Sequence, residues 1–288
     1  MKITLEFLNN FYQINTDFGW NLAIPLAFNR QQPNHFDADQ ASSKVMQAGG
    51  FVGNTEQGGS CNVNELTLNP HCNGTHTETI AHICDFSAPL SQMISKMNIP
   101  ALMPCVLITI TPELGQQSCD SYSPDFACDD LVITCAALKQ ALNSYDNAQL
   151  AAVLIRTLPN ELDKQTRHYN QDAQPPFLSR EAILYLNERG VEHLLVDMPS
   201  IDRLHDDGLM SCHHLFWQVP ARTHQPSANS LYHKTVTEMI YVDNQLVDGF
   251  YFLNLQTPAF INDAAPSRPV LYGVEKIAKQ SPQKQQQE

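Results

Sequence analysis

Residues 179–196 read SREAILYLNERGVEHLLV, and this stretch decides the fold class. Ser179 is a suitable N-cap for a helix that extends to residue 189, and Glu181 complements the positive end of that helix. Gly190 stands where a left-handed residue commonly ends a helix. Residues 191–196 form a short apolar-rich run that ends at an aspartate, which is typical of a buried strand. The stretch therefore predicts a helix followed directly by a strand.

Two similar apolar runs, residues 105–110 and 151–155, precede this helix. A strand, a long connection with a helix and a further strand imply a crossover unit, so part of the sheet is expected to be parallel or mixed. Residues 238–254 alternate enough to add further strands. We therefore predict an α/β fold, with one domain over residues 1–280 and a disordered polar tail at residues 281–288.

Composition excludes several classes of partner. The chain has 288 residues, with 17 Lys+Arg against 30 Asp+Glu, so its formal charge is −13. Nucleic acids and anionic membranes need clustered cations, so neither is an expected partner. The longest apolar stretch, residues 99–110, is too short to cross a bilayer. Residues 1–13 resemble no signal peptide, and the eight cysteines form no CxxC pair. We predict a cytoplasmic protein.

The strongest chemical signal is residues 69–82, NPHCNGTHTETIAH, with three histidines, a glutamate and a cysteine. If the middle of this stretch is extended, His76 and Glu78 point to one side. If a helix then begins near Thr79, His82 lies one turn beyond Glu78 and faces the same space. Imidazole and carboxylate groups together bind divalent metals. The alternative is a loop of capping and hydrogen-bonding residues around the Asn-Gly turn.

A second cluster, SCHH at residues 211–214, is followed by Glu238. A histidine pair alone is more often satisfied by hydrogen bonds than bound to metal. The acidic loop with Asp202, Asp206 and Asp207 is expected to be solvated rather than a metal site.

Other chemistries have weaker support. Arg156, at the end of a buried strand, is expected to be paired and structural. A serine hydrolase should contain GxSxG, but GGSCN at residues 58–62 ends in asparagine. Cys72, Cys84 and Cys212 are interpreted as small packing residues rather than nucleophiles.

The first cluster resembles the HxGTHxDxPxH signature of the metal-dependent cyclase-like hydrolases, which include bacterial kynurenine formamidase and isatin hydrolase. Other stretches agree in order and character over roughly residues 20–275. They are NLAIPL at 21–26, LIRT at 154–157, VDMPSID at 196–202 and PSRPV at 266–270. The resemblance implies a mixed, barrel-like central sheet flanked by helices, and assembly as a homodimer or homotetramer.

The resemblance also implies roles for particular residues. His76 and Glu78 match two metal ligands, and the acid at this position bridges two metals in the family. His82 matches a proton-transfer residue, and the late ligands fall on Glu238 and on His213 or His214. Early aromatic residues, here Phe18 and Trp20, line the substrate pocket in the family, although such residues are more often part of the core.

The first metal ligand is open between two neighbours. The spacing of the signature places it on Cys72, whereas His71 lies one residue earlier. We favour His71, because an Asn-Gly turn absorbs a one-residue insertion easily. The chain also has Glu78 where the family has aspartate, Ile80 in place of its proline, and residues 220–229 resemble an inserted loop.

The resemblance implies an arylformamidase-like function, the cleavage of the carbon–nitrogen bond of a small amide or formamide. Water activated by Zn²⁺ or Mn²⁺ would be the nucleophile, and the resemblance implies two ions per chain. The alternatives are a lyase or cyclase with the same metal site, and a binding protein that retains metal without turnover.

Overall fold

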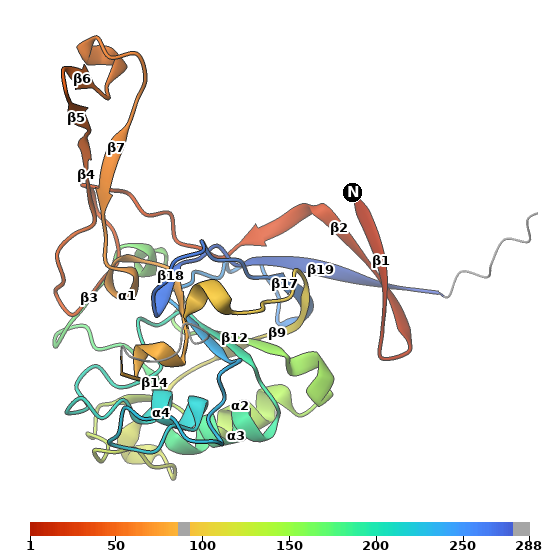
Figure 1. Cartoon of the computed structure of the whole chain (residues 1–288). Coiled ribbons are helices and arrows are strands. Elements are labelled where there is room, and N and C mark those ends of the chain that lie inside the picture. The colour runs from red at the N-terminus through yellow and green to blue at the C-terminus, as the bar shows by residue number, and fades with distance from the viewer. Residues whose placement is uncertain (86–92, 279–288) are drawn as a thin grey trace, which may run out of the picture.

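The computed structural model describes residues 1–85 and 93–278. Its central feature is a mixed sheet of ten strands (Figure 1). In spatial order the strands are β1 (Lys2–Phe7), β2 (Asn10–Asn21), β19 (Val270–Ile277), β17 (Gly249–Asn254), β9 (Met103–Ile110), β12 (Ala152–Thr157), β15 (His193–Val196), β16 (Thr235–Glu238), β8 (His76–Glu78) and β18 (Ala264–Pro266).

The middle of the sheet is parallel. The strands β9, β12, β15 and β16 run in the same direction, and the other pairs are antiparallel. Every residue of β12 is buried, as expected of a strand covered on both faces. The three strands and the crossover predicted from the sequence are confirmed.

The helix α3 (Arg180–Glu188) makes that crossover. The side chain of Ser179 accepts a hydrogen bond from the backbone N–H of Ala182, and Gly190 has φ of 75°. The predicted start and end of this helix are therefore confirmed. With α2 (Cys135–Leu142) and α4 (Ser211–Trp217), it covers one face of the sheet (Figure 1).

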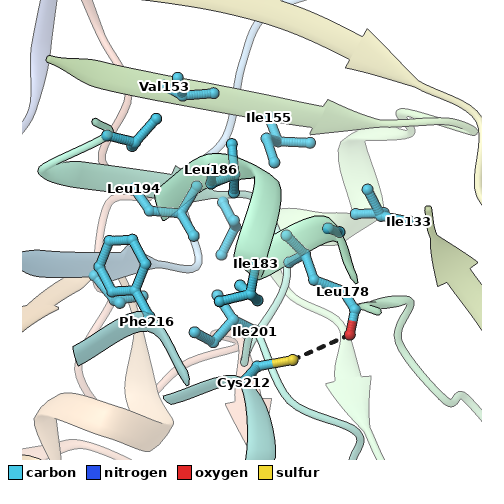
Figure 2. Close-up of a cluster of buried hydrophobic side chains, with 14 of the residues drawn as sticks. Ile133, Val153, Ile155, Leu178, Ile183, Leu186, Leu194, Ile201, Cys212 and Phe216 are labelled. Atoms are coloured by element: carbon cyan, nitrogen blue, oxygen red, sulfur yellow. Dashed lines mark hydrogen bonds between the residues drawn. The ribbon is translucent and has the colours of Figure 1, made fainter. Parts of the chain in front are cut away.

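The two faces of the sheet bury separate apolar clusters. Val153 and Ile155 of β12 belong to the cluster under the helices, and Leu154 belongs to the cluster on the opposite face. This alternation follows from the two-residue period of a strand. Figure 2 shows Leu186 of α3 and Phe216 of α4 packed against the strand residues. The helices are thereby fixed to the sheet.

Smaller elements surround this body. The pairs β4 (Ser42–Val45) with β7 (Asn64–Thr67), and β5 (Gln47–Ala48) with β6 (Phe51–Val52), form an arm that projects from the body (Figure 1). The remaining short elements are β3 (Asn34–His35), β10 (Glu113–Leu114), β11 (Leu131–Ile133), β13 (His168–Tyr169), β14 (Phe177–Leu178), α1 (Pro70–Asn73) and the 3₁₀ turns at Thr55–Gln57, Ile80–His82, Ile94–Lys96, Gly115–Gln117, Asn147–Leu150 and Leu162–Gln165.

The α/β class is confirmed by the large mixed sheet. Closure of the sheet into a barrel and the limits of the domain stay predictions, and residues 281–288 lie outside the described part of the chain. Of residues 238–254, only the two ends form strands: Glu238 ends β16, and β17 begins at Gly249. Within the described residues no helix is long and apolar enough to cross a membrane.

Arg156 is paired, as expected. From the end of β12 its guanidinium donates to Thr109 Oγ1 and to the backbone carbonyls of Asp243 and Leu246, each at 2.9 Å. Asp248 Oδ1 lies 3.2 Å from Nη2. Buried guanidinium groups need such partners, so Arg156 ties the strand end to residues 243–248.

Helix α3 gives a matched test of the core. Leu186 is fully buried, whereas Leu184 on the same helix is 44% exposed. Leu186→Ala should lower the free energy of unfolding by about 2–5 kcal/mol because it leaves a cavity. Leu184→Ala should change it by about 0.5 kcal/mol or less. Urea unfolding followed by circular dichroism measures both, and equal losses would contradict the packing described for α3.

Candidate metal centre

The strand β8 carries His76 and Glu78 into the interior, where both side chains are fully inaccessible. It lies between β16 and β18, antiparallel to both. Glu238 of β16 is directly opposite His76, and opposite residues of an antiparallel pair share a face of the sheet. The sheet therefore brings Glu238, 162 residues later in the chain, beside the first cluster.

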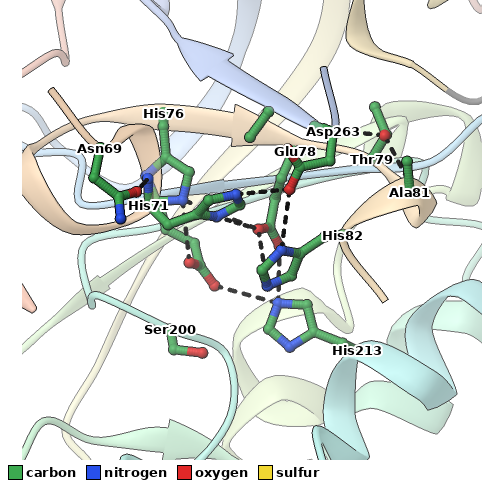
Figure 3. Close-up of polar contacts among 12 residues, drawn as sticks. Asn69, His71, His76, Glu78, Thr79, Ala81, His82, Ser200, His213 and Asp263 are labelled. Carbon is green, nitrogen blue, oxygen red and sulfur yellow. Dashed lines mark hydrogen bonds and ion pairs between the residues drawn. The ribbon is translucent and has the colours of Figure 1, made fainter. Parts of the chain in front are cut away.

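Two short helical turns beside β8 supply His71 and His82. Asn69 caps α1 by accepting a hydrogen bond from the backbone N–H of His71 at 3.0 Å. Thr79 caps the turn Ile80–His82 in the same manner, through the N–H of Ala81. These turns place the two imidazole rings face to face, with centroids 4.2 Å apart (Figure 3).

The helix α4 supplies His213. Its Nε2 lies 2.8 Å from Glu78 Oε1 and 3.6 Å from Glu238 Oε1. The next residue, His214, points elsewhere, and its Nδ1 lies 3.3 Å from the backbone carbonyl of Val219. Of the two candidates, the structure therefore brings His213 and not His214 to the cluster.

Each of the four imidazoles has one nitrogen held by an oxygen on the outside of the cluster. Since carboxylates and carbonyls only accept, the histidine N–H donates in each pair. The four pairs are His76 Nδ1 with the Gly74 carbonyl at 3.0 Å, His71 Nε2 with Asp263 Oδ2 at 2.8 Å, His82 Nδ1 with the same Asp263 oxygen at 3.3 Å, and His213 Nδ1 with Asp202 Oδ2 at 2.5 Å.

The second nitrogen of each ring lies within 4.0 Å of a Glu78 carboxylate oxygen (Figure 3), although that of His76 is nearer to Glu238 Oε2, at 3.5 Å. His213 Nε2 lies 2.8 Å from one carboxylate oxygen. Three others approach Oε2: His71 Nδ1 at 3.1 Å, His82 Nε2 at 3.7 Å and His76 Nε2 at 4.0 Å. When the outer N–H is fixed and the ring is neutral, the inner nitrogen carries a lone pair, which is the form of histidine that binds metal.

The pKa values of the cluster indicate that its buried carboxylates are balanced by positive charge. Burial by itself raises the pKa of Glu78, but the charges of His82 and His213 and the hydrogen bond from His213 hold it well below its usual value. Burial lowers the pKa of His71, but Asp263 and Glu78 outweigh it and raise this pKa to about 10. Without another cation, protons on the histidines therefore balance the buried carboxylates.

Two buried atoms of the cluster indicate whether its side chains can bind a metal ion. His76 Nε2 and Glu78 Oε2 are buried and make no hydrogen bond of good geometry, although His71 Nδ1 lies 3.1 Å from the Glu78 oxygen. They lie 4.0 Å apart, and together with a ring nitrogen of His71 they form a group of possible ligand atoms that all lie within 4.8 Å of one another. Overlapping sets of side chains could hold an ion: His71 with His76 and Glu78, and Glu78 with His82 and His213. The donor set fits Zn²⁺ or Mn²⁺.

The cluster opens into a cavity of about 240 Å³. His71, His82, His213 and Glu238 lie on its wall, and so does Cys72. Burial raises the pKa of the Cys72 thiol, and the nearby charge of Glu238 adds to this. A ring nitrogen of His71 groups with His76 and Glu78, whereas Cys72 belongs to none of the possible ligand sets among the described residues. His71 is therefore the better placed of the two neighbours.

Trp20 is not among the described residues that line this cavity. It lies on β2 opposite Leu271 of β19 and is 40% exposed, and Phe18 is 76% exposed. Neither aromatic side chain belongs to the core. Contact between Trp20 and a substrate stays a prediction.

The sequence did not predict that Asp263 and Asp202 hold histidines of the cluster. Asp263 directly precedes β18, and the strand places its carboxylate between His71 and His82; no local pattern in the sequence marks it. The expectation that the loop with Asp202 and Asp206 is solvated is wrong for these two residues, which are buried. Asp202 accepts hydrogen bonds from Tyr122 Oη and from the backbone N–H groups of Cys212 and His213, so it fixes the start of α4.

Comparisons with known proteins agree with this arrangement. A family model described as "Putative cyclase" matches residues 14–203. No curated protein matches the chain.

Solved structures share the fold over most of their length. A predicted metal-dependent hydrolase from Bacillus stearothermophilus aligns with a TM-score of 0.55 and 15% identity, over 88% of this chain and 98% of that one. Isatin hydrolase A from Labrenzia aggregata, bound to benzyl benzoate, gives 0.58 and 17%, over 90% and 94%. Isatin hydrolase A from Ralstonia solanacearum gives 0.55 and 18%, over 88% and 91%.

The neighbouring histidines of α4 give a matched test of the cluster. His213→Asn should weaken zinc binding by more than the roughly 10- to 100-fold that the loss of an outer hydrogen-bond partner causes. His214→Asn should leave zinc binding unchanged, because this ring points away from Glu78. Titration of chelator-treated protein with zinc measures both affinities, and equal affinities for the two variants would exclude His213 as a ligand.

Asp263 should act through the two histidines that it holds. Asp263→Asn keeps the shape of the side chain but removes its charge, and we expect zinc affinity to fall by about 10- to 100-fold. Asp172→Asn, at an exposed position outside the cluster, is the control. Unchanged affinity in the Asp263 variant would show that the carboxylate does not orient His71.

Proposed function

Because this chain belongs to the cyclase family, we propose that it is a metal-dependent hydrolase that cleaves the carbon–nitrogen bond of a small amide or formamide. The observation that carries the proposal is the set of four imidazoles that each place one nitrogen within 4.0 Å of the buried carboxylate of Glu78. This arrangement adjoins a cavity that can admit a small molecule. The homodimeric or homotetrameric assembly implied by the resemblance stays a prediction.

The proposed metal ligands are His71, His76, Glu78, His213 and Glu238. The set of His71, His76 and Glu78 contains three of these residues. Glu78 and His213 also belong to a set with His82, in which His82 would be a ligand rather than a proton-transfer residue. Glu238 is held in place by the backbone N–H of Ile201, which donates to Oε1 at 2.9 Å. Its other oxygen lies 3.5 Å from the unpaired Nε2 of His76.

A divalent ion at this site, Zn²⁺ or Mn²⁺, would polarise a carbonyl oxygen and lower the pKa of water from about 15.7 to about 7. The protein's own residues supply the rest. Asp202 and Asp263 fix the rings of His213, His71 and His82 from outside. Preorganised groups of this kind do not have to reorient during the reaction, which favours catalysis.

We propose His82 as the general acid and base. Its side chain is 25% exposed, whereas those of His76 and His213 are almost completely enclosed. It lines the cavity, and Asp263 holds its Nδ1, so Nε2 is the nitrogen free to take a proton from water. The same nitrogen would return that proton to the leaving amine.

Removal of His82 separates its two possible roles. His82→Ala should retain zinc but lose about 10²- to 10⁴-fold in turnover of an aryl formamide, because only the proton transfer is removed. Turnover of formanilide and zinc content by elemental analysis check this. A variant that loses its zinc would make His82 a ligand, and a variant with full turnover would remove it from the mechanism.

The metal itself is tested by thermal unfolding. Zinc at about 100 times its dissociation constant should stabilise the protein by about 2.7 kcal/mol, because it binds the folded state alone. The wild-type protein, treated with chelator and then reloaded with zinc or manganese, should regain formanilide hydrolysis. If neither ion raises the melting temperature or restores turnover, the proposed function fails.

A further inference from the structure

His35 stands on the wall of the same cavity, away from the proposed metal ligands in the sequence. It is the last residue of the short strand β3, which pairs in parallel with β13. His35 is only 3% exposed. Its Nδ1 is buried without a hydrogen-bond partner. Buried polar atoms almost always have partners, so an unpaired one beside a cavity points to a group that binds there.

The backbone after His35 is strained. Phe36 and Asp37 have φ of 57° and 49°, a left-handed backbone conformation that residues other than glycine rarely adopt. Two such residues in succession turn the chain so that the Phe36 ring lies against the His35 ring, with centroids 3.9 Å apart. Strain of this kind persists where the surrounding structure maintains it, and it is concentrated at functional sites.

Phe36 extends this wall beyond the metal cavity. It is 59% exposed, and it also lines a neighbouring cavity of about 370 Å³ together with Tyr169 and Leu204. An exposed ring between two cavities offers an apolar surface to a flat part of a ligand. His35 and Phe36 thus place one polar and one apolar group side by side.

The chemistry of the wall favours an uncharged ligand group. Burial, with the charges of His76 and His71, lowers the pKa of His35 to about 3, so its ring is neutral near pH 7. A neutral imidazole offers one donor and one acceptor. Arg203, which also lines the cavity, is paired with Asp130 at 3.2 Å. The neutral ring of His35 therefore suits an amide C=O or N–H group better than a carboxylate.

We propose that His35 is a specificity-determining residue that exchanges a hydrogen bond with an uncharged amide group of the substrate, while Phe36 packs against the rest of the molecule. This inference rests on the proposed function, because it assigns the substrate contact of the same cavity. It also makes a separate claim, that recognition depends on a residue outside the metal centre.

The test uses benzamide, an uncharged aryl amide that resists hydrolysis, and the full-length zinc-loaded protein. Calorimetric titration should show binding to the wild type that is about tenfold weaker in His35→Leu, the effect of one lost hydrogen bond. His35→Gln, which keeps a donor and an acceptor, should recover part of that loss. His168→Leu, an exposed position on the partner strand β13, is the control and should bind as the wild type does.

Two further readouts exclude a structural role. The zinc content of His35→Leu should equal that of the wild type. Its melting temperature should be unchanged or higher, because an unpaired buried polar atom is replaced by an apolar group. A lower melting temperature or a loss of zinc would overturn the proposal, as would equal binding of benzamide by the wild type and His35→Leu, or no binding by either.

Hydrolysis of formanilide by the wild type is measured in parallel and tests the proposed function separately. Binding of benzamide that depends on His35, without hydrolysis of formanilide, would contradict the hydrolase and support the His35 contact. Hydrolysis that is the same in the wild type and His35→Leu would support the hydrolase and overturn the contact.

Discussion

The structure around the site depends on one buried carboxylate. Glu78 is fully inaccessible at the centre of the cluster. Transfer of a carboxylate from water into a protein interior costs several kcal/mol unless positive charge and hydrogen bonds offset it. Four histidines surround Glu78, and two of them, His71 and His213, have raised pKa values because of it and the outer carboxylates. In the folded chain this carboxylate therefore needs positive charge beside it.

The sheet satisfies this condition by uniting distant parts of the chain. The strand β8 lies between β16 and β18. Glu238 of β16 and Asp263, which directly precedes β18, are therefore brought to the cluster that contains His76 and Glu78. The helix α4 adds His213 while Phe216, from the same helix, packs in the core under the sheet. Core packing thus fixes the position of His213, because a shift of α4 would disturb the packing of Phe216 as well as the cluster.

The lining of the cavity combines two kinds of chemistry. It includes three imidazoles and Glu238, and it also includes His35, whose Nδ1 is unpaired, and Phe36, which has a left-handed backbone conformation. A substrate in this cavity would meet both the proposed metal centre and the neutral ring of His35. Such an arrangement separates activation of the bond from recognition of the rest of the molecule.

The sequence alone determined the features that depend on neighbouring residues. Helix α3 with its cap at Ser179 and Gly190, the three buried strands, and the shared direction of His76 and Glu78 all follow from local periodicity. Only the tertiary structure showed that His71 and His213 direct a ring nitrogen at Glu78, whereas His214 turns to the backbone carbonyl of Val219. It also revealed Asp263, which lies 192 residues from its partner His71. It also showed that Asp202 is buried, although the acidic loop around it was expected to be solvated. These contacts depend on which strands become neighbours in the sheet. A pattern within one segment of the sequence cannot predict them, because their partners lie in distant segments.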